Sequence, residues 1–502
     1  MSAPERSSLL LRRLPSPLGL ALLVLGGILV LVALAHGLAD ADYFWHFATG
    51  RLIADSGQVP SSDPFSFTWA GRPWTPHEWL GELLIYGLVS GLGGTLTAIV
   101  FGLLSAGAVA LGALTAARLT AARLGARSLP IVVAAAISAL VLVGYVTVRP
   151  QVISWLLFGV LSLLLLSLDG ARPRRALLLI PLFVVWANLH GLYVVGLGAV
   201  AVYALFTLAG RSPMAAARGW MAVGAVGALL GSMATPAGPA GILYPLRYLR
   251  PGDWGLSHIA EWQSPNFHDP ANIGLLLLVV GMAALGTRRV PGWMALLSWI
   301  GLAMSLVSLR NAPIAAVWAL PVVAASLQAR LSVALQARLP VADPRPPPAS
   351  RQLARRLMET TMAVVVLASA GVIIGPQIVS PAQALERAGL PVAGVDELAR
   401  TMPNARVFAE YGWAGYVINR LHDRGARVFV DGRNDMYPQA ILEDYSSIRE
   451  AHSGWQAKLD RYGTDAILLP PDAPLAGVAS SSAWCEKLRD DHQVLLERCA
   501  QP

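Results

Sequence analysis

Long apolar runs, separated by short polar connections, make up most of the chain. A transmembrane helix needs about 20 predominantly apolar residues, although tilt and local thinning of the bilayer allow somewhat shorter spans. Eleven runs meet this requirement, at residues 17–38, 95–117, 129–147, 151–168, 176–189, 192–210, 219–235, 271–286, 291–309, 313–328 and 359–378. The pattern predicts a mainly α fold whose larger part is a polytopic helical membrane domain of about eleven transmembrane helices.

Two segments between these runs have a different character. Residues 79–92 form an apolar run that is short for a transmembrane helix. Glu82 interrupts the run, and two glycines follow it. We expect the run to form an amphipathic helix that lies on the outer surface or dips into it, as part of a first outer loop at 39–94. Residues 329–358 are rich in proline and arginine, and because proline interrupts helices we expect a cytoplasmic linker there.

The arginines predict which side of the membrane each connection faces, because cytoplasmic connections carry an excess of Lys and Arg. Arg6, Arg12 and Arg13 precede the first run and place the N-terminus in the cytoplasm. With alternation from there, every inner connection is basic, through Arg118, Arg123, Arg127, Arg172, Arg174, Arg175, Arg211, Arg218, Arg288, Arg289, Arg330 and Arg338. An odd number of spans then puts the C-terminal part outside.

A cleaved signal peptide is the alternative interpretation of residues 17–38, because small residues suited to a cleavage site occur at 33–35. The run is longer than the usual apolar region of a signal peptide, which favours a transmembrane helix. Cleavage would leave the sides of the later loops unchanged.

The pattern changes after residue 378. Short β-prone runs, "ARVFAEY", "ARVFVDG", "TDAILLP" and "HQVLLER", alternate with helix-like stretches at 412–422, 437–461 and 475–490. We therefore divide the chain into a membrane domain at 1–378 and a small C-terminal extracytoplasmic α/β domain at 379–502. No glycine-rich phosphate loop follows its first strand, so a nucleotide site is not supported.

Composition and charge agree with a membrane protein. The chain is 55% hydrophobic and 14% charged, whereas soluble domains are about 25% charged. Its net charge is +8, but the basic residues form short clusters between apolar runs, which indicates orientation in the membrane and not nucleic-acid binding. The two cysteines, Cys485 and Cys499, exclude a four-cysteine zinc site. In an oxidising exterior they could join the last helix to the last strand, although spacing alone does not decide this.

Polar and ionisable side chains concentrate at the outer ends of the predicted spans. An ionisable group at membrane depth is costly unless it is paired or lines a wet cavity. The outer ends carry Asp40, Asp42, His46, Arg51, His77, Glu78, Arg149, Gln151, Asn188, His190, Glu261, Gln263, Asn266, Arg310 and Asn311. We expect several helix ends to enclose one polar cavity at the outer face.

Several of these residues also have a simpler structural interpretation. Arg149 precedes a proline and could be a helix-end residue that reaches the interface, and His190 could satisfy a backbone carbonyl at a kink. For four tryptophans we favour an interfacial aromatic belt over the alternative of stacking on a sugar, namely Trp45, Trp69, Trp74 and Trp79. Asp40 and Asp42 are different, because two acids at the end of a first span gain nothing from the positive-inside rule.

These residue types fit the transfer of a sugar from a lipid-linked donor. A carboxylate at the water-facing end of a span can accept a proton from a hydroxyl, or it can hold a divalent cation together with a second acid. Arginines opposite it can hold a phosphate or diphosphate leaving group through paired hydrogen bonds.

The motifs resemble those of a family of bacterial multi-span proteins that are described as glycosyltransferase-like and grouped with the GT-C superfamily. The resemblance runs from about residue 38 to the C-terminus, through "DADYFWHFATGRLIADSGQVPSSDPFSFTWAGRPWTPHEWL", "VRPQVISW", "WANLHGLYVVG", "EWQSPNF", "LRNAPI" and "FVDGRNDMY". It implies a GT-C-like fold in a bacterial cytoplasmic membrane, often with a soluble C-terminal domain outside.

The resemblance also implies an activity and candidate residues. GT-C enzymes use polyprenyl-phosphate or polyprenyl-diphosphate sugars at the outer face, with an essential acid just after the first span as base or metal ligand. Asp40 and Asp42 match that position, and His77 with Glu78 stands in place of a second acidic motif. Metal dependence through Asp40 and Asp42 therefore stays open.

The leading hypothesis is an inverting, integral-membrane glycosyltransferase that transfers the sugar to a glycan, lipid or protein acceptor. Its catalytic candidates are Asp42 and Asp40, and its substrate-binding candidates are His46, His77, Glu78, Arg149, Gln151, His190, Glu261, Arg310 and Asn311. The alternatives are a transporter or flippase for a lipid-linked glycan, and a non-catalytic scaffold.

The C-terminal motif "VFVDGRNDMYP" adds Asp431, Arg433 and Asp435 just after a strand, where α/β sheets commonly bind ligands. A turn stabilised by an Asp–Arg pair is one interpretation. In the other, this edge covers the membrane cavity and helps to select the acceptor.

Overall fold

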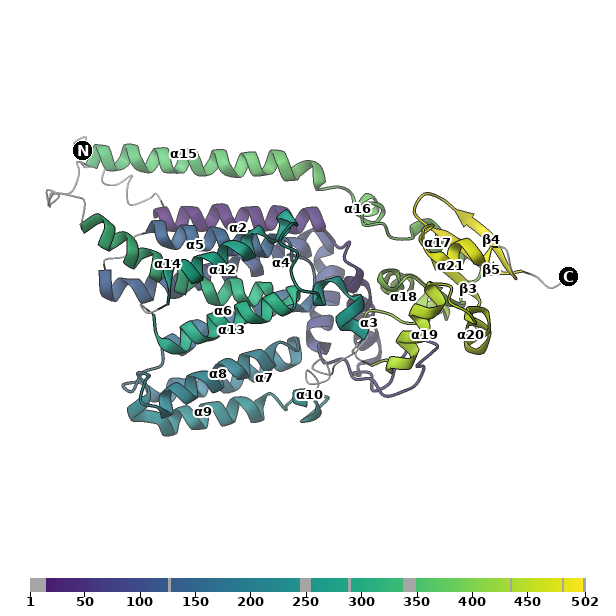
Figure 1. Ribbon diagram of the computed structural model, residues 1–502, viewed down its shortest axis with the longest axis horizontal. Helices are drawn as coiled ribbons and strands as arrows, with labels where there is room; N and C mark the ends of the chain where they lie inside the picture. Colours follow the sequence, from purple (N-terminus) through teal and green to yellow (C-terminus); the bar gives the residue numbers. More distant parts are fainter. Residues whose placement is uncertain are drawn as a thin grey trace.

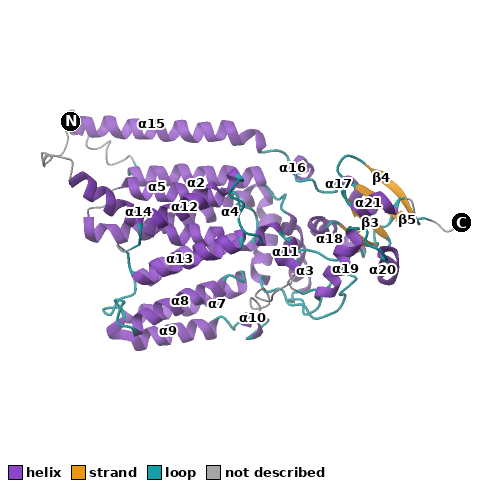
Figure 2. Cartoon of the chain, in the orientation of Figure 1, coloured by secondary structure: helices purple, strands orange, loops and turns teal. Residues whose placement is uncertain are grey.

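The computed structural model describes residues 15–124, 128–243, 254–287, 290–336, 349–433, 436–480 and 483–499. A helical bundle and a small mixed domain lie at opposite ends of the molecule (Figure 1). The strands are confined to the mixed domain (Figure 2). The division of the chain near residue 378 stays a prediction.

Helices occupy the positions of all eleven predicted runs. They are α2 (Pro17–His36), α4 (Trp79–Leu124), α5 (Ser128–Val143), α6 (Pro150–Leu166), α7 (Leu179–Leu189), α8 (Tyr193–Leu208), α9 (Arg218–Gly231), α12 (Ile273–Leu285), α13 (Gly292–Val307), α14 (Ala312–Gln336) and α15 (Ala349–Ile374). Within the described ranges, four helices are long and apolar enough to cross a membrane by length and composition, and several others are apolar but shorter. The protein is thus a multi-pass membrane protein, and the number of eleven spans stays a prediction.

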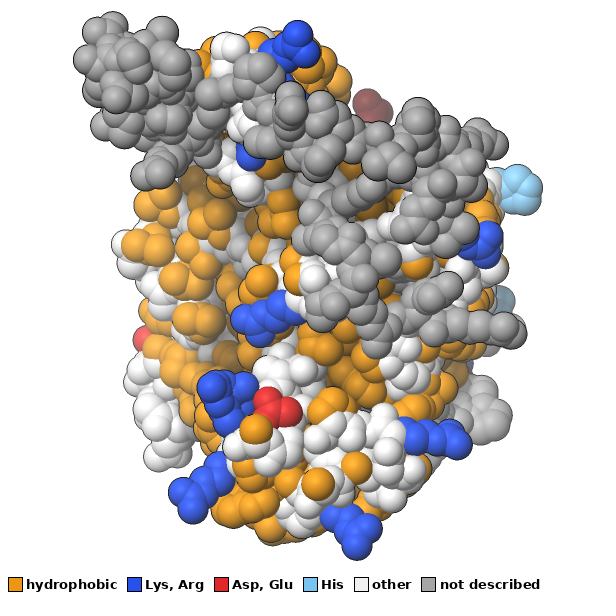
Figure 3. Space-filling view, turned by 90° about the vertical axis from the view of Figure 1, so that its left-hand side faces the viewer, with side chains coloured by type: hydrophobic (Ala, Val, Ile, Leu, Met, Phe, Trp, Pro, Cys, Tyr) orange, Lys and Arg blue, Asp and Glu red, His pale blue; other side chains and the backbone are white. Residues whose placement is uncertain are grey.

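The surface of the bundle agrees with the predicted inner side. At the end away from the mixed domain, Lys and Arg side chains are scattered between apolar ones, with little acid in view (Figure 3). α15 runs along the outside of the bundle against α2 (Figure 1). Which face is cytoplasmic stays a prediction.

The segment 79–92 is helical, as predicted, and a kink at Gly93 separates it from the rest of α4. The φ of Gly93 is +79°, where a side chain would be strained. The position of the segment at the outer surface of the membrane stays a prediction. This part packs closely on its neighbours, because a Cβ at Gly81 would lie 2.5 Å from the carbonyl oxygen of Leu189.

The predicted linker at 329–358 is too long. α14 continues to Gln336 and α15 begins at Ala349, so helix covers both ends of the linker. The prolines lie at 340–348, and the segments on either side are rich in residues that favour helices. The helices therefore extend close to the prolines. Residues 337–348 lie outside the described residues.

The mixed domain contains a five-stranded sheet of order β2-β1-β3-β5-β4. Its strands are β1 (Arg406–Ala409), β2 (Arg427–Val428), β3 (Ala466–Leu469), β4 (Trp484–Arg489) and β5 (Val494–Arg498), and its helices are α16 (Pro381–Arg387), α17 (Val392–Thr401), α18 (Ala414–Leu421), α19 (Gln439–Arg449), α20 (Trp455–Tyr462) and α21 (Pro474–Ala479). β2, β1 and β3 are parallel, and β5 and β4 are antiparallel.

Two predicted helices of this domain were wrong in extent. The stretch 437–461 forms two helices, because Gly454 interrupts it with φ of +85°. In the stretch 475–490 only the start is helical, and Trp484–Arg489 forms strand β4. Cys485 and Cys499 are bonded, as considered, but the disulfide joins β4 to the residue after β5 and does not involve a helix.

The first outer loop and the mixed domain are joined through the sheet. Ser66 forms a parallel bridge with Val428, which belongs to the edge strand β2. Val428 N–H donates to Phe65 O (3.0 Å), and Phe67 N–H donates to Val428 O (3.0 Å). Helix α3 (Ala41–Ser56) packs on α18 beside this bridge.

Helix α3 approaches the start of α4 so closely that only glycine fits at position 50. A Cβ there would collide with the carbonyl oxygen of Glu82 and would lie 2.8 Å from Tyr86 Cβ. We expect Gly50→Ala to destabilise the protein by about 1–3 kcal/mol, as overpacking does. Gly87→Ala on α4 is the control, because nothing lies within 4 Å of the added Cβ. Thermal unfolding in detergent measures both, and equal melting temperatures would contradict the close packing of α3.

Candidate functional site

Where the bundle meets the mixed domain, acidic side chains surround Arg149. Arg149 Nε donates to Asp40 Oδ1 (2.6 Å), Nη2 lies 3.1 Å from Asp42 Oδ2, and Nη1 lies 3.1 Å from Glu261 Oε1. Arg310 Nη1 lies 4.0 Å from the same Glu261 oxygen. We call these five residues the Arg149 cluster.

The start of α3 gives the two aspartates different roles. Asp40 is the N-cap, and its Oδ1 accepts a hydrogen bond from Asp42 N–H (2.9 Å). Asp42 lies in the first turn, where Trp45 Nε1 donates to its Oδ1 (3.2 Å). Asp42 is therefore not needed as a cap, and its carboxylate is held by Trp45 and Arg149.

The Arg149 cluster has an excess of negative charge, with three carboxylates and two arginines. Burial raises the pKa of the Asp42 carboxyl, and Asp40 and Glu261 raise it further against the opposing effect of Arg149. At Glu261, Arg149 and Arg310 outweigh burial and lower the pKa. Asp42, whose side chain is 24% exposed, is thus the carboxylate of the cluster best suited to take up a proton.

Glu78 is the centre of a second group of buried side chains. His77 Nε2 donates to Glu78 Oε1 (3.0 Å), and His190 Nε2 lies 3.3 Å from the same oxygen. His46 lies between two acids, with Nε2 3.7 Å from Glu78 Oε2 and Nδ1 3.2 Å from Glu82 Oε1. We call these five residues the Glu78 cluster.

Hydrogen bonds fix the proton of His190. Leu192 N–H donates to His190 Nδ1 (3.2 Å), so that nitrogen is an acceptor and the ring proton is on Nε2, facing Glu78. Trp186 Nε1 donates to Ser154 Oγ (2.8 Å), whose hydroxyl then donates to the same Nδ1 (2.9 Å). Burial lowers the pKa of His190 to about 4. Of the two interpretations of His190, the bond to a backbone carbonyl does not describe these contacts, because the ring accepts from a backbone N–H and faces Glu78.

His46 links the two clusters. Its ring lies against the Trp45 ring, tilted by 34° with 3.6 Å between the centroids, and Trp45 donates to Asp42. Burial lowers the pKa of His46 to about 3 despite the opposing effect of Glu78. At neutral pH this ring is therefore uncharged, and the clusters are contiguous through one turn of α3.

The structure brings together nine of the predicted site residues, namely Asp40, Asp42, His46, His77, Glu78, Arg149, His190, Glu261 and Arg310. Gln151 is buried in the first turn of α6. Asn311 donates to Met304 O (3.3 Å) near the end of α13. Arg51 pairs with Asp423 (3.0 Å).

Sequence reasoning missed Glu82 and Ser154, and it misplaced two tryptophans. Glu82 follows Glu78 by four residues on one helix face, a spacing that could have identified it. Trp45 and Trp74 are buried, at 8% and 5% exposure, and do not belong to an interfacial belt.

The arrangement of acids does not fit a metal site. In the described segments, no group of three or more His, Cys, Asp or Glu side chains is placed to hold a metal ion. The guanidinium of Arg149 fills the space between Asp40, Asp42 and Glu261, where a cation would have to lie.

The C-terminal candidates form a buried pair. Arg433 Nε donates to Asp431 Oδ1 (2.8 Å), which supports the interpretation as a turn held by an Asp–Arg pair. Asp435 lies outside the described residues.

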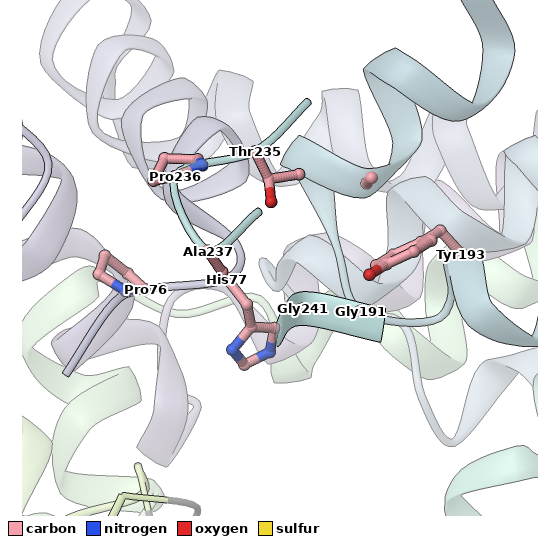
Figure 4. Close-up of a pocket in the computed structure, with 9 residues that line it drawn as sticks. Pro76, His77, Gly191, Tyr193, Thr235, Pro236, Ala237 and Gly241 are labelled. Carbon is pink, nitrogen blue, oxygen red and sulfur yellow. The ribbon is translucent and has the colours of Figure 1, made fainter. Parts of the chain in front are cut away.

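A small pocket adjoins the Glu78 cluster at His77. It is lined by Pro76, His77, Ala187, Gly191, Tyr193, Thr235, Pro236, Ala237 and Gly241. The His77 ring and the hydroxyl groups of Tyr193 and Thr235 point toward its centre (Figure 4). Most of its lining is apolar, and His77 joins it to the buried acids.

Comparisons with known proteins place the fold. No protein-family profile matches the chain, and no curated protein matches it in sequence. It is similar to the archaeal oligosaccharyltransferase AglB from Archaeoglobus fulgidus in complex with an inhibitory peptide and a dolichol-phosphate, with a TM-score of 0.57, 12% identity, and coverage of 88% of this chain and 69% of that one. The apo form of the Archaeoglobus fulgidus oligosaccharyltransferase gives a TM-score of 0.53 at 12% identity, with the same coverage of 88% and 69%.

ArnT from Cupriavidus metallidurans bound to undecaprenyl phosphate gives a TM-score of 0.49 at 16% identity, covering 95% of this chain and 97% of that one. At these identities the similarity concerns the fold alone. The evidence for the fold comes from the AglB structures, whose TM-scores are 0.57 and 0.53. The chain thus shares the fold of the AglB structures, which agrees with the GT-C-like fold that its motifs led us to expect.

Proposed function

We propose that the protein is a glycosyltransferase that moves a sugar from a polyprenyl-phosphate-linked donor to an acceptor at the outer face of the cytoplasmic membrane. The observation that carries this proposal is Asp42, a partly exposed carboxylate with a raised pKa, set beside two arginines at the junction of bundle and mixed domain. AglB, which shares the fold, was solved with a dolichol-phosphate, and this supports a lipid-phosphate donor.

The proposed reaction is a single displacement. The acceptor hydroxyl bonds to the anomeric carbon as the bond from that carbon to the phosphate oxygen breaks, and the lipid phosphate leaves with the electron pair. Asp42 takes the hydroxyl proton, and a raised pKa makes its carboxylate a stronger base. One base suffices for a direct displacement, which is why we propose inversion at the anomeric carbon.

Arg310 is the better candidate for the lipid phosphate. Arg149 is 14% exposed and holds three carboxylates, so its charge is already compensated. Arg310 is 32% exposed, and its guanidinium lies over the Trp262 ring (5.3 Å). A charged group with that access can hold a phosphate through paired hydrogen bonds. In this proposal Arg149 holds the carboxylates of Asp40, Asp42 and Glu261 in position and does not bind the phosphate.

The Glu78 cluster has a structural role next to the Arg149 cluster. Its members come from α3, from the first turn of α4 with the two residues before it, and from the residue that follows α7. The buried members are His46, Glu78, Glu82 and His190. We propose that it fixes these helix ends. His77 is the exception, since it lines the pocket and can contact a substrate.

Asp42→Asn tests the catalytic role. We expect the transfer rate to fall by about 100-fold or more, because the amide cannot accept the proton. The assay supplies the purified protein in lipid with a panel of radiolabelled polyprenyl-phosphate sugars and follows donor consumption. Asp55→Asn, on the exposed face of the same helix, is the control and should keep full activity. Unchanged turnover in Asp42→Asn, or no donor consumed by the wild type, contradicts the proposal.

Arg310→Gln tests the phosphate contact. Loss of a charge-assisted hydrogen bond costs about 1.5–3 kcal/mol, so we expect the donor KM to rise about tenfold or more, with a smaller rise in Arg310→Lys. Arg330→Gln is the matched control, because that residue caps the Ala284 carbonyl on an exposed part of α14. A donor KM that does not change in Arg310→Gln assigns the phosphate to another residue.

A further inference from the structure

A glycine of the mixed domain touches the proposed base. A Cβ on Gly432 would lie 2.6 Å from Asp42 Oδ1 and 2.7 Å from Trp45 Nε1. Both atoms belong to the hydrogen bond that holds the Asp42 carboxylate. The backbone of Gly432 therefore lies directly against that bond, and the position of the mixed domain bears on the position of Asp42.

The next residue, Arg433, is 1% exposed and is held by acids from two distant parts of the chain. Arg433 Nη2 donates to Asp431 Oδ2 (2.6 Å) and to Asp63 Oδ1 (2.8 Å). Tyr437 hydroxyl donates to Asp431 Oδ2 (2.8 Å). The guanidinium thus connects the loop after β2 to the first outer loop.

Aromatic rings of the first outer loop enclose the same guanidinium. Its carbon lies 4.3 Å from the centroid of Trp74 and 4.8 Å from the centroid of Phe65. Cation–π contacts of this kind gain strength when they are desolvated. We call this group the Arg433 clamp, made of Asp63, Phe65, Trp74, Asp431, Arg433 and Tyr437.

Asp63 also organises its own loop for the sheet. Its carboxylate accepts hydrogen bonds from Phe65 N–H (3.0 Å) and Ser66 N–H (3.2 Å). These two residues are the ones at which the loop meets Val428. The Arg433 clamp therefore fixes the loop residues that pair with Val428, and this pairing in turn holds the loop against the sheet.

We propose that Arg433 is a positioning residue, which docks the mixed domain on the first outer loop so that Gly432 holds Asp42 and Trp45 in place. The inference rests on the proposed role of Asp42. A planar guanidinium can bond two carboxylates and stack on rings at once, which an ammonium group cannot do. Removing it leaves two buried carboxylates without their counter-charge, and this favours separation of the loop from the domain.

A cysteine pair can measure docking without any activity. A Cβ on Gly412, in the mixed domain, would lie 3.9 Å from Ala41 Cβ at the start of α3, within the range of about 3.5–4.5 Å for disulfides. The two native cysteines are already bonded to each other. Ala41→Cys with Gly412→Cys should therefore cross-link readily on oxidation in the full-length protein.

We expect Arg433→Gln to slow this cross-link at least tenfold, and Asp63→Asn to slow it as well. Asp63→Asn acts from the first outer loop and leaves the residues of the mixed domain intact, so it separates docking from misfolding. Arg420→Gln is the control, because Arg420 pairs with Asp396 on the exposed surface (2.9 Å), and its rate should equal that of the wild type. An unchanged rate in Arg433→Gln overturns the proposal.

Activity provides the second readout. Without the cross-link, Arg433→Gln should lower kcat at least tenfold and change the donor KM less than twofold, because a small displacement of a catalytic group costs rate. Forming the 41–412 cross-link in this variant should restore kcat to that of the cross-linked wild type. A kcat that stays low after cross-linking overturns the positioning role. If the wild type transfers no sugar, the proposed function fails, whereas the cross-linking rates still decide whether Arg433 docks the domain.

Discussion

The site depends on one guanidinium shared by three carboxylates. Arg149 lies just before α6, Asp40 and Asp42 lie at the start of α3, and Glu261 lies in the segment before α12. Each acid alone would be costly so close to apolar helices, and the three would repel one another without the arginine. Arg149 therefore sets the spacing of these three segments, and the excess of negative charge leaves Asp42 with its raised pKa.

A second shared guanidinium repeats this principle on the other side of Asp42. Arg433 bonds one acid from the mixed domain and one from the first outer loop, and it brings Gly432 against Asp42. Both arginines act as junctions between segments that are remote in sequence. In this account the mixed domain is part of the site, because the loop after β2 forms one wall around the carboxylate.

The positions of the helices and of most site residues could be predicted from sequence, and the pairings could not. Apolar runs mark helices because burial in lipid requires them, and the alternation of arginines assigned Asp42, Arg149 and Glu261 to one end of the bundle before their contacts were known. The Asp63–Arg433 pair joins residues 370 positions apart, and no local pattern contains that information. Strand β4 was taken for helix, because its Glu, Lys and Arg favour helices whereas pairing with β5 decides its structure.

A structure of the Asp42→Asn variant with a polyprenyl-phosphate sugar bound would test the central claim most directly. The account predicts that the donor phosphate contacts Arg310 and that the anomeric carbon faces the side chain at position 42, with room between them for an acceptor hydroxyl. A donor seated away from Arg310, with its anomeric carbon turned from α3, would contradict the assignment of Asp42 as the base.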